Sequence, residues 1–466
     1  MTGRQESSGK LRVFVTLYAT AYLADLTEAW QWPIAGLVFL ALTAWVACSR
    51  DARRALLVFS GIGAAYTLGF QFPDVGNHDN AILFLNLYFL VAAWRSGRRR
   101  ETEDELFETL CSPVRVIVIL VYFWAGFSKL NRDFFHPEVG CAADFSTNIL
   151  EAFHLPPFAF TTMTATAAAL FVLTWELGGA FALLFRRLQL PMLFLCWIMH
   201  TTLAQLIFFD FAALVFALLL TFLPEEQWRQ LLERRRVRLG PWAIRRELLY
   251  FSGFAVATCL SGLLLQRDPG HDGHHRWQVI AIAAGFLVFV WPVVETSFRR
   301  KTRWVGVPVW SKHARCGDAV VPALVVLWAL QPYLGLRTAG CFTMFSNLRT
   351  EGEESNHLLL GSNPLKVFDY QEDLVEVLEL DARHARNSQE KLAGHFVPVV
   401  EFKKRIVEWR RRGLEGLHAE FRYQGRHTVT EDVVADNPWN VEGRSLEMYL
   451  LDFRKVQSEG PNQCRW

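Results

Sequence analysis

The feature that most constrains this chain is a series of long apolar runs, which recur from residue 11 to residue 336. Runs of about 17 to 25 residues have the length that an α-helix needs to cross roughly 30 Å of hydrocarbon. Asp25 and Glu28 weaken the first run, and the seventh and eighth are either a tight hairpin or one bent element. The eleven candidate membrane spans are 11–28, 31–48, 55–74, 79–94, 114–130, 157–185, 190–206, 209–223, 247–266, 277–297 and 318–336. The sequence therefore predicts an all-α polytopic membrane bundle of about nine to eleven helices.

A change in composition separates the last part of the chain from the rest. Hydrophobic residues make up 52% of the whole sequence, but from residue 360 onward it is polar and charged. We expect a transmembrane domain at 1–336 and a soluble domain at 337–466, with the half-apolar segment 340–361 capping the bundle. Within the soluble domain we predict a helix at 396–413 and strands at 366–380, 418–430 and 445–456. We therefore expect a small α+β or mostly-β domain.

Basic clusters indicate how the bundle is oriented. With eleven spans they all fall on the side of the N-terminus, which the positive-inside rule assigns to the cytoplasm. The clusters are 50–54, 95–100, 185–187, 233–238 and 299–303. The C-terminal domain and most other titratable residues then lie outside the cytoplasm. The opening residues carry no cleavage site for a signal peptide, and a net charge of +2 implies no attraction to nucleic acid.

Lys129 follows the apolar run "VRVIVILVYFWAGF" at 114–127. A lysine at the end of a membrane helix can extend its ammonium into the lipid headgroups. The predicted orientation argues against that role, because it places Lys129 on the non-cytoplasmic side. Gly126 would let another backbone or a ligand come close. Burial beside apolar walls lowers the pKa of a lysine, so Lys129 is a candidate general base.

His78 and Asn77 open the fourth span on the same predicted face as Lys129. Asn77 or Asp79 can cap the helix by accepting backbone N–H groups. Capping does not account for a histidine at the membrane boundary, where an imidazole could donate a hydrogen bond to a developing oxyanion. If both residues take part in chemistry, Lys129 and His78 should face one shared cavity.

Glu176 and His200 lie inside predicted spans, where an ionisable group needs a partner. They form either a polar bridge between helices or part of a reactive site. The histidines at 271–275 are too few for a di-iron site and the chain has no C-x-x-C pair, so we predict no metal site. Three cysteines face the non-cytoplasmic side, and the sequence does not decide whether any two of them form a disulfide: Cys141, Cys341 and Cys464.

Four segments together resemble a known family. "YFWAGFSKLNRDFF" at 122–135 resembles the Y-F-x-A-G-x-x-K-L-x-x-D-W segment of vitamin K-dependent γ-glutamyl carboxylases and of bacterial proteins that share their horizontally transferred transmembrane (HTTM) domain. "GNHDNAILFLNL" is similar to the family's Asn-His segment, with His78 located 51 residues before Lys129. "WELGGAFALLF" followed by "MHTTLAQLIFF" is similar to the pair of helices that comes next in the family. "FTMFSNLRTEGEESNHLL" resembles the junction just after the last span in bacterial members. The likeness covers about residues 11–365 and points to a bacterial-type member in a cell membrane.

The resemblance implies a reaction and roles for three residues. In the carboxylases the lysine matching Lys129 deprotonates reduced vitamin K, and oxygen addition then gives an alkoxide that removes a proton from a glutamate side chain. The resulting carbanion takes up carbon dioxide and the quinone leaves as an epoxide. The histidine matching His78, with the residue matching Asn77, stabilises the charged intermediate. The implied cofactors are a vitamin K or menaquinol-type hydroquinone, O2 and CO2. Candidates for contact with the quinone or substrate are Glu176, His200, Trp124, Asn347 and Arg349.

The sequence departs from the family in three ways. Phe134 stands where the carboxylases have Trp, and Ser128 stands at a position where they can have a second lysine. The soluble part is much shorter than in animal carboxylases, whose C-terminal region helps to hold the protein substrate. The expected partners are the lipid bilayer, a secreted peptide or protein substrate and a separate quinone epoxide reductase. The alternative is a membrane protein without this activity that binds or matures a secreted peptide or a lipid. In that case Lys129, Glu176 and His200 would serve as structural polar links.

Overall fold

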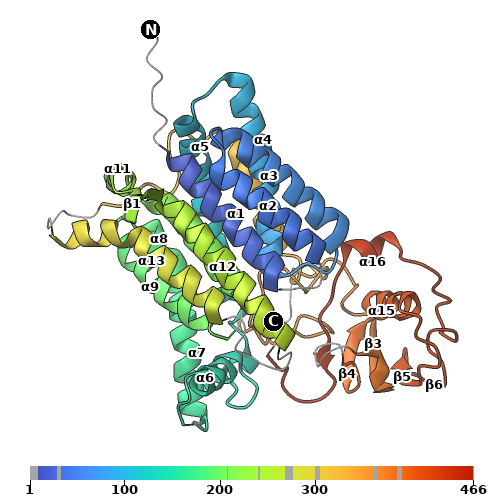
Figure 1. Cartoon of the computed structure of the whole chain (residues 1–466). Helices are drawn as coiled ribbons and strands as arrows, with labels where there is room; N and C mark the ends of the chain where they lie inside the picture. The colour runs from blue at the N-terminus through green and yellow to red at the C-terminus, as the bar shows by residue number, and fades with distance from the viewer. Residues whose placement is uncertain are drawn as a thin grey trace.

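A computed structural model describes residues 9–28, 33–156, 158–206, 208–239, 242–267, 276–299, 305–361, 365–385 and 391–464. Helices make up most of the chain as far as α14, and a smaller domain of helix and sheet follows (Figure 1). Each part has a hydrophobic core of its own. The predicted helical bundle with a small C-terminal α+β domain is therefore confirmed.

Helices coincide with all eleven predicted spans. Between α9 and α10, Phe208 has a left-handed backbone with φ of 63°, so these are two separate helices instead of one bent element. The helices are α1 Lys10–Glu28, α2 Pro33–Cys48, α3 Ala52–Tyr66, α4 Asn77–Arg99, α5 Glu103–Ser128, α7 Thr162–Leu173, α8 Gly179–Leu184, α9 Gln189–Leu203, α10 Phe209–Leu219, α12 Arg246–Arg267, α13 Arg276–Arg299 and α14 Val320–Ala329. Shorter elements between them are α6 Cys141–Ala152, α11 Glu225–Glu233 and the hairpin of β1 Arg236–Leu239 with β2 Trp242–Arg245.

Helix α5, which leads to Lys129, begins well before the predicted span 114–130. Thr102 and Glu105 form a capping box that starts it. Pro113 lies inside the helix and cannot donate to the carbonyl of Thr109. The hydroxyl of Tyr88 on α4 donates to that carbonyl at 3.2 Å instead. A neighbouring helix thus supplies the missing hydrogen bond, and α5 continues past its proline.

Length and composition support fewer membrane spans than the sequence pattern predicts. Among the described residues two helical segments are long and apolar enough to cross a membrane: α5 and Thr162–Leu184, which comprises α7 and α8. Five further apolar helical segments have 10–17 residues. Several of these helices nevertheless expose large apolar side chains, such as Ile34 on α2 at 77% and Met163 on α7 at 79%. Exposed apolar faces on helices without charged residues, as in α2 and α7, are typical of surfaces that contact lipid or a partner.

The C-terminal domain is a five-stranded antiparallel sheet with one helix packed on it. The strand order is β6-β5-β3-β4-β7, with β3 Leu374–Leu380, β4 His395–Pro398, β5 Ala419–Tyr423, β6 Arg426–Thr430 and β7 Val456–Gln457. Helix α15, Val399–Arg411, buries Phe402 and Ile406 against the sheet. The hairpin that turns at Gly425 is confirmed, and so is the predicted helix from Val399 onward, whereas 396–398 belong to β4. Of the strand predicted at 366–380, only 374–380 pairs in the sheet, as β3. The strand predicted at 445–456 is wrong, because Ser445 caps a short helix, α16 Leu446–Leu450, and only the end of the segment pairs as β7.

Three of the predicted basic clusters, 50–54, 95–100 and 233–238, lie at one end of the bundle. Arg12 donates to the carbonyl of Arg50 at 2.7 Å, and Arg53 donates to the carbonyl of Glu101 at 3.0 Å. Helix α11 and β1 lie at this same end, next to the start of α1, while the C-terminal sheet lies at the other end (Figure 1). Most of the fifth cluster, 299–303, lies outside the described residues. The bundle therefore has a basic end and, opposite to it, an end covered by the C-terminal domain.

Candidate functional site

Lys129 directly follows α5 and is only 2% exposed. Its Nζ lies 2.9 Å from Oε2 of Glu176 and donates to the carbonyl oxygens of Met344 at 2.8 Å and Ala125 at 3.2 Å. The side chain folds back along α5, because Ala125 is one turn before it. Lys129 is therefore held inside the protein by three acceptors, and its ammonium does not extend from the helix end toward headgroups.

A π-helical turn brings Glu176 to Lys129. This turn, η3 Thr174–Gly178, joins α7 to α8, and such turns are frequent at functional sites. Gly126 on α5 faces it closely: a Cβ at this position would lie 2.8 Å from Cγ of Leu177 and 3.1 Å from Cβ of Glu176. The missing side chain of Gly126 thus permits the close approach that the sequence analysis predicts.

The Lys129–Glu176 pair borders a cavity of about 500 Å3. This size is within the usual range for small-molecule sites, about 300–1,000 Å3. The other walls are mostly apolar or aromatic and come from the 3-10 turn 132–135, α6, α7, the π-helical turn, α9 and the segment after α14; they include Phe134, Phe171, Trp175 and Phe345. The indole N–H of Trp175 is buried and has no hydrogen-bond partner among the described residues. This cavity, which we call the lysine cavity, suits a largely apolar ligand with a polar group at the Lys129 end.

His200 is bound to Tyr122 and not to Glu176. Its Nε2 lies 2.5 Å from the hydroxyl of Tyr122 on α5, and that hydroxyl also donates to Sγ of Cys196 at 3.2 Å. His200 and Tyr122 border a small apolar cavity of about 40 Å3 that Glu176 also lines. These contacts form a polar bridge between α5 and α9.

His78 lies between carboxylates from two other helices. Its Nε2 is 2.8 Å from Oδ2 of Asp210 on α10 and 3.1 Å from Oδ1 of Asp25 on α1. Asp79 lies further away at 3.9 Å and accepts from the backbone N–H of Gly76, so it is the residue that caps α4. Asp25 and Asp210 are both buried. We refer to Asp25, His78 and Asp210 as the histidine cluster.

Among the described residues, Lys129 and His78 do not line a common cavity. His78 and Asn77 border a second cavity of about 500 Å3, which we call the histidine cavity and which also includes Arg405 of the C-terminal domain. Phe345 lines both cavities, and the neighbouring Met344 lines the histidine cavity while its carbonyl accepts from Lys129. The segment that follows α14 thus separates the two residues that were expected to act together.

Two other predicted site residues, Asn77 and Asn347, hold this segment in place. Asn77 accepts from the backbone N–H of Thr343 at 3.1 Å. Asn347 accepts from the N–H of Cys141 and donates to the carbonyls of Val139 and Asn462. These bonds make 340–361 a cap over the ends of α4 and α5, as predicted.

Two further candidates lie outside the lysine cavity. Trp124 packs against Phe127 and Tyr333, and Arg349 donates to the carbonyls of Glu351 and Gln457. Neither side chain lines either large cavity. The structure therefore gives Trp124 and Arg349 packing and anchoring roles within the described part of the chain.

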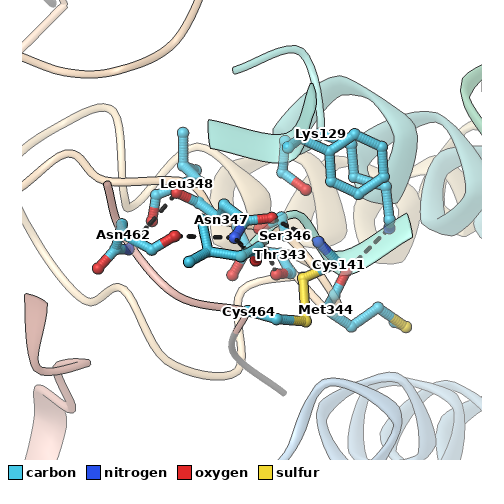
Figure 2. Close-up of a disulfide and its surroundings, with 12 residues drawn as sticks. Lys129, Cys141, Thr343, Met344, Ser346, Asn347, Leu348, Asn462 and Cys464 are labelled. Atoms are coloured by element: carbon cyan, nitrogen blue, oxygen red, sulfur yellow. Dashed lines mark hydrogen bonds between the residues drawn. A yellow bond between two sulfur atoms is a disulfide. The ribbon is translucent and has the colours of Figure 1, made fainter. Parts of the chain in front are cut away.

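One disulfide closes the cap beside the lysine cavity. Cys141 at the start of α6 is bonded to Cys464 near the C-terminus (Figure 2). Cys141 also lines the lysine cavity, and Asn347 lies next to the disulfide. Cys341 is buried and free. Of the three cysteines expected on this face, the structure therefore pairs Cys141 with Cys464.

Asp25 and Asp210 are absent from the predicted site, although the sequence contains the signal for them. An ionisable residue within an apolar span indicates a functional or bridging position, and the same rule singled out Glu176 and His200. In the sequence, Asp25 weakens the first predicted span, and Asp210 lies at the junction of the two segments predicted as either a hairpin or one bent element. The histidines at 271–275 lie outside the described residues. Comparisons with protein-family models, curated proteins and solved structures gave no match.

Proposed function

We propose that this chain is an integral membrane enzyme that binds a lipid-soluble hydroquinone in the lysine cavity and uses Lys129 with Glu176 to accept its proton. The observation that carries the proposal is a buried lysine–carboxylate pair at one end of an otherwise apolar cavity of about 500 Å3. The family resemblance of the sequence around Lys129 supports the same role. The exposed apolar faces of α2 and α7 support placement in a bilayer, with the basic end of the bundle in the cytoplasm.

The pair has a defined proton balance. At rest it holds one transferable proton, either on Nζ of Lys129 opposite the carboxylate, or on Glu176 opposite a neutral amine. Accepting one proton from a phenolic hydroxyl leads from both states to the same result, an ammonium on Lys129 and a protonated Glu176. The ammonium then faces the phenolate oxygen in an apolar environment, where such an attraction is stronger than in water.

The remaining walls determine what can bind. Phe134, Phe171 and Trp175 offer flat apolar surfaces that suit a quinone ring, and the buried indole N–H of Trp175 is available as a donor to a ring oxygen. A bound vitamin K or menaquinol-type hydroquinone would supply the reducing equivalents for O2 and, as the family resemblance implies, the basicity for carboxylation of a glutamyl side chain by CO2. His78 has no part in this proposal, because it lines the other cavity.

The test uses purified full-length protein in detergent with reduced menaquinone or vitamin K. We expect O2-dependent quinol oxidation with epoxide formation, lost in Lys129→Met and strongly reduced in Glu176→Gln. Lys10→Met is the matched control, because Lys10 is also a buried lysine paired with carboxylates but lies at the basic end. Oxidation that survives in Lys129→Met, or is lost equally in Lys10→Met, would refute the proposed role.

Binding separates the enzyme from the alternative function. Quinol should quench tryptophan fluorescence in the wild type, and Trp175→Phe should remove part of that quenching. Lys129-dependent binding without any oxidation would favour a membrane protein that binds a lipid without transforming it. Extraction of membranes with alkaline carbonate provides a separate check, since an integral membrane protein stays in the pellet.

A further inference from the structure

We propose that Asp25, His78 and Asp210 bind a first-row divalent metal ion of the Mn2+ to Zn2+ series, with coordination positions open to the histidine cavity. The three ligand atoms come from α1, α4 and α10 and lie within 4.8 Å of one another. His78 lines the histidine cavity, and none of the three residues lines the lysine cavity, so this inference is independent of the proposed quinol chemistry.

The distances fit a shared metal ion. Two ligands bound at about 2.1 Å and at right angles lie about 3.0 Å apart, and in a tetrahedral arrangement about 3.4 Å apart. The separations from Nε2 of His78 are 2.8 Å to Asp210 and 3.1 Å to Asp25. A metal ion can be placed no more than about 2.5 Å from each of the three ligand atoms. Movements of the side chains by a few tenths of an ångström would then give metal–ligand bonds of normal length.

Hydrogen bonding alone explains this geometry less well. One nitrogen of an imidazole carries a single hydrogen and can direct it at one carboxylate, yet Nε2 of His78 is at contact distance from two. Together with Asp79, the histidine cluster brings three carboxylates and one imidazole close together. With all three carboxylates ionised, negative charges exceed positive charges by two even when the imidazole is protonated. A divalent cation would balance that excess.

The ligands indicate the class of metal. One imidazole nitrogen with two carboxylate oxygens suits Mn2+, Fe2+ or Zn2+, whereas Mg2+ and Ca2+ prefer oxygen ligands alone. Three protein ligands leave coordination positions for water or a substrate, as in catalytic metal sites. The histidine cavity provides room on that side, with Asn77 and Arg405 among its walls. An anionic group bound to the metal could therefore also contact Arg405.

The test measures metal binding by full-length protein that has been treated with EDTA. We expect one Mn2+ or Zn2+ per chain by elemental analysis after gel filtration, with Mg2+ and Ca2+ unable to displace it at equal concentration. The isosteric variants Asp25→Asn and Asp210→Asn, and also His78→Ala, should weaken metal binding at least about tenfold. About tenfold is the smallest loss of metal affinity that is typical when a residue hydrogen-bonded to a ligand is changed, and loss of a ligand itself should cost at least as much. Asp144→Asn, outside the cluster, should bind like the wild type.

A spectroscopic readout keeps the test decisive if a variant fails to fold. Mn2+ bound to the wild-type protein should show coupling to a directly bound imidazole nitrogen in pulsed EPR, and labelling histidine with 15N should change that coupling. Added Zn2+ should raise the unfolding temperature of the wild type but not of His78→Ala. No bound metal in the wild type, no nitrogen coupling, or equal binding in all variants would overturn the proposal.

Discussion

Substituting Gly126 by alanine tests the contact that brings Glu176 to Lys129. The new Cβ would lie 2.8 Å from Cγ of Leu177, well short of the roughly 3.5–4.0 Å at which carbon atoms attract each other. It would also lie 3.1 Å from Cβ of Glu176. The π-helical turn must therefore move away from α5 by several tenths of an ångström, and the ion pair of 2.9 Å must lengthen with it.

Two opposing effects set the size of the change. Alanine is favoured over glycine inside a helix by about 1 kcal/mol. Overpacking a well-filled contact typically costs about 1–3 kcal/mol. We therefore expect the free energy of unfolding to fall by up to about 2 kcal/mol in Gly126→Ala, together with weaker quinol binding.

Gly253 on α12 provides the matched control, because a Cβ there would meet no atom within 4 Å. Only the helix preference then remains, so Gly253→Ala should be as stable as the wild type or more stable by up to about 1 kcal/mol. Thermal unfolding in detergent, followed by circular dichroism, compares the three proteins. If Gly126→Ala unfolds at the same temperature as Gly253→Ala and binds quinol normally, the close contact does not hold Glu176 in place.

Two further predictions concern the C-terminal domain. Reducing the disulfide between Cys141 and Cys464, or changing Cys464 to serine, should lower the free energy of unfolding by about 2–5 kcal/mol and increase proteolysis of the C-terminal tail. Cys341→Ser is the control, and because Cys341 is free, this variant should respond to reductant as the wild type does. Burial opposes the charges of Lys404 and Asp452, but opposite charges nearby outweigh it, among them their own contact at 2.5 Å. The pKa of Lys404 is therefore raised, with help from Glu401 and Asp74, and the pKa of Asp452 is lowered, with help from Arg337. The stability from Asp452 is complete above its unfolded pKa of about 3.9 and is lost as pH falls further. The stability from Lys404 is complete below its unfolded pKa of about 10.4 and is lost as pH rises further. The protection of the α15 amides against hydrogen exchange, relative to the intrinsic exchange rate at each pH, should therefore be greatest between these limits.

The fold was predictable to the extent that apolar periodicity determines it. Runs of apolar residues correctly located helices at all eleven predicted spans, because a buried or lipid-facing helix needs such a run. The acidic segment 101–112 is predicted as a separate short helix, but it forms the first turns of α5, which a capping box starts and which Tyr88 of another helix keeps continuous past Pro113. The strand predicted at 445–456 failed because alternation over a short segment does not distinguish a strand from a single helical turn capped by Ser445.

The site was predictable residue by residue but not as an arrangement. Lys129 and Glu176 were chosen separately for being ionisable in apolar surroundings, and the structure places them 2.9 Å apart. The sequence does not show that a π-helical turn rotates Glu176 toward α5. It also does not show that His78 turns to Asp25 and Asp210, because those contacts join helices far apart in the chain.

The segment between the two cavities links them, although their chemistry is separate. Phe345 lines both cavities and has a left-handed backbone with φ of 50°, a conformation that costs a bulky residue about 1–2 kcal/mol. The surroundings that hold it include Phe145 and Phe208, whose rings lie 4.5 Å and 5.1 Å away. Lys129 binds the carbonyl of the preceding residue, so movement of the lysine pair would shift a wall of the histidine cavity. Coupling between sites requires such a shared element with two arrangements. Quinol binding that changes when the metal is removed would indicate that this segment has two arrangements, whereas independent binding would show that it is a rigid wall.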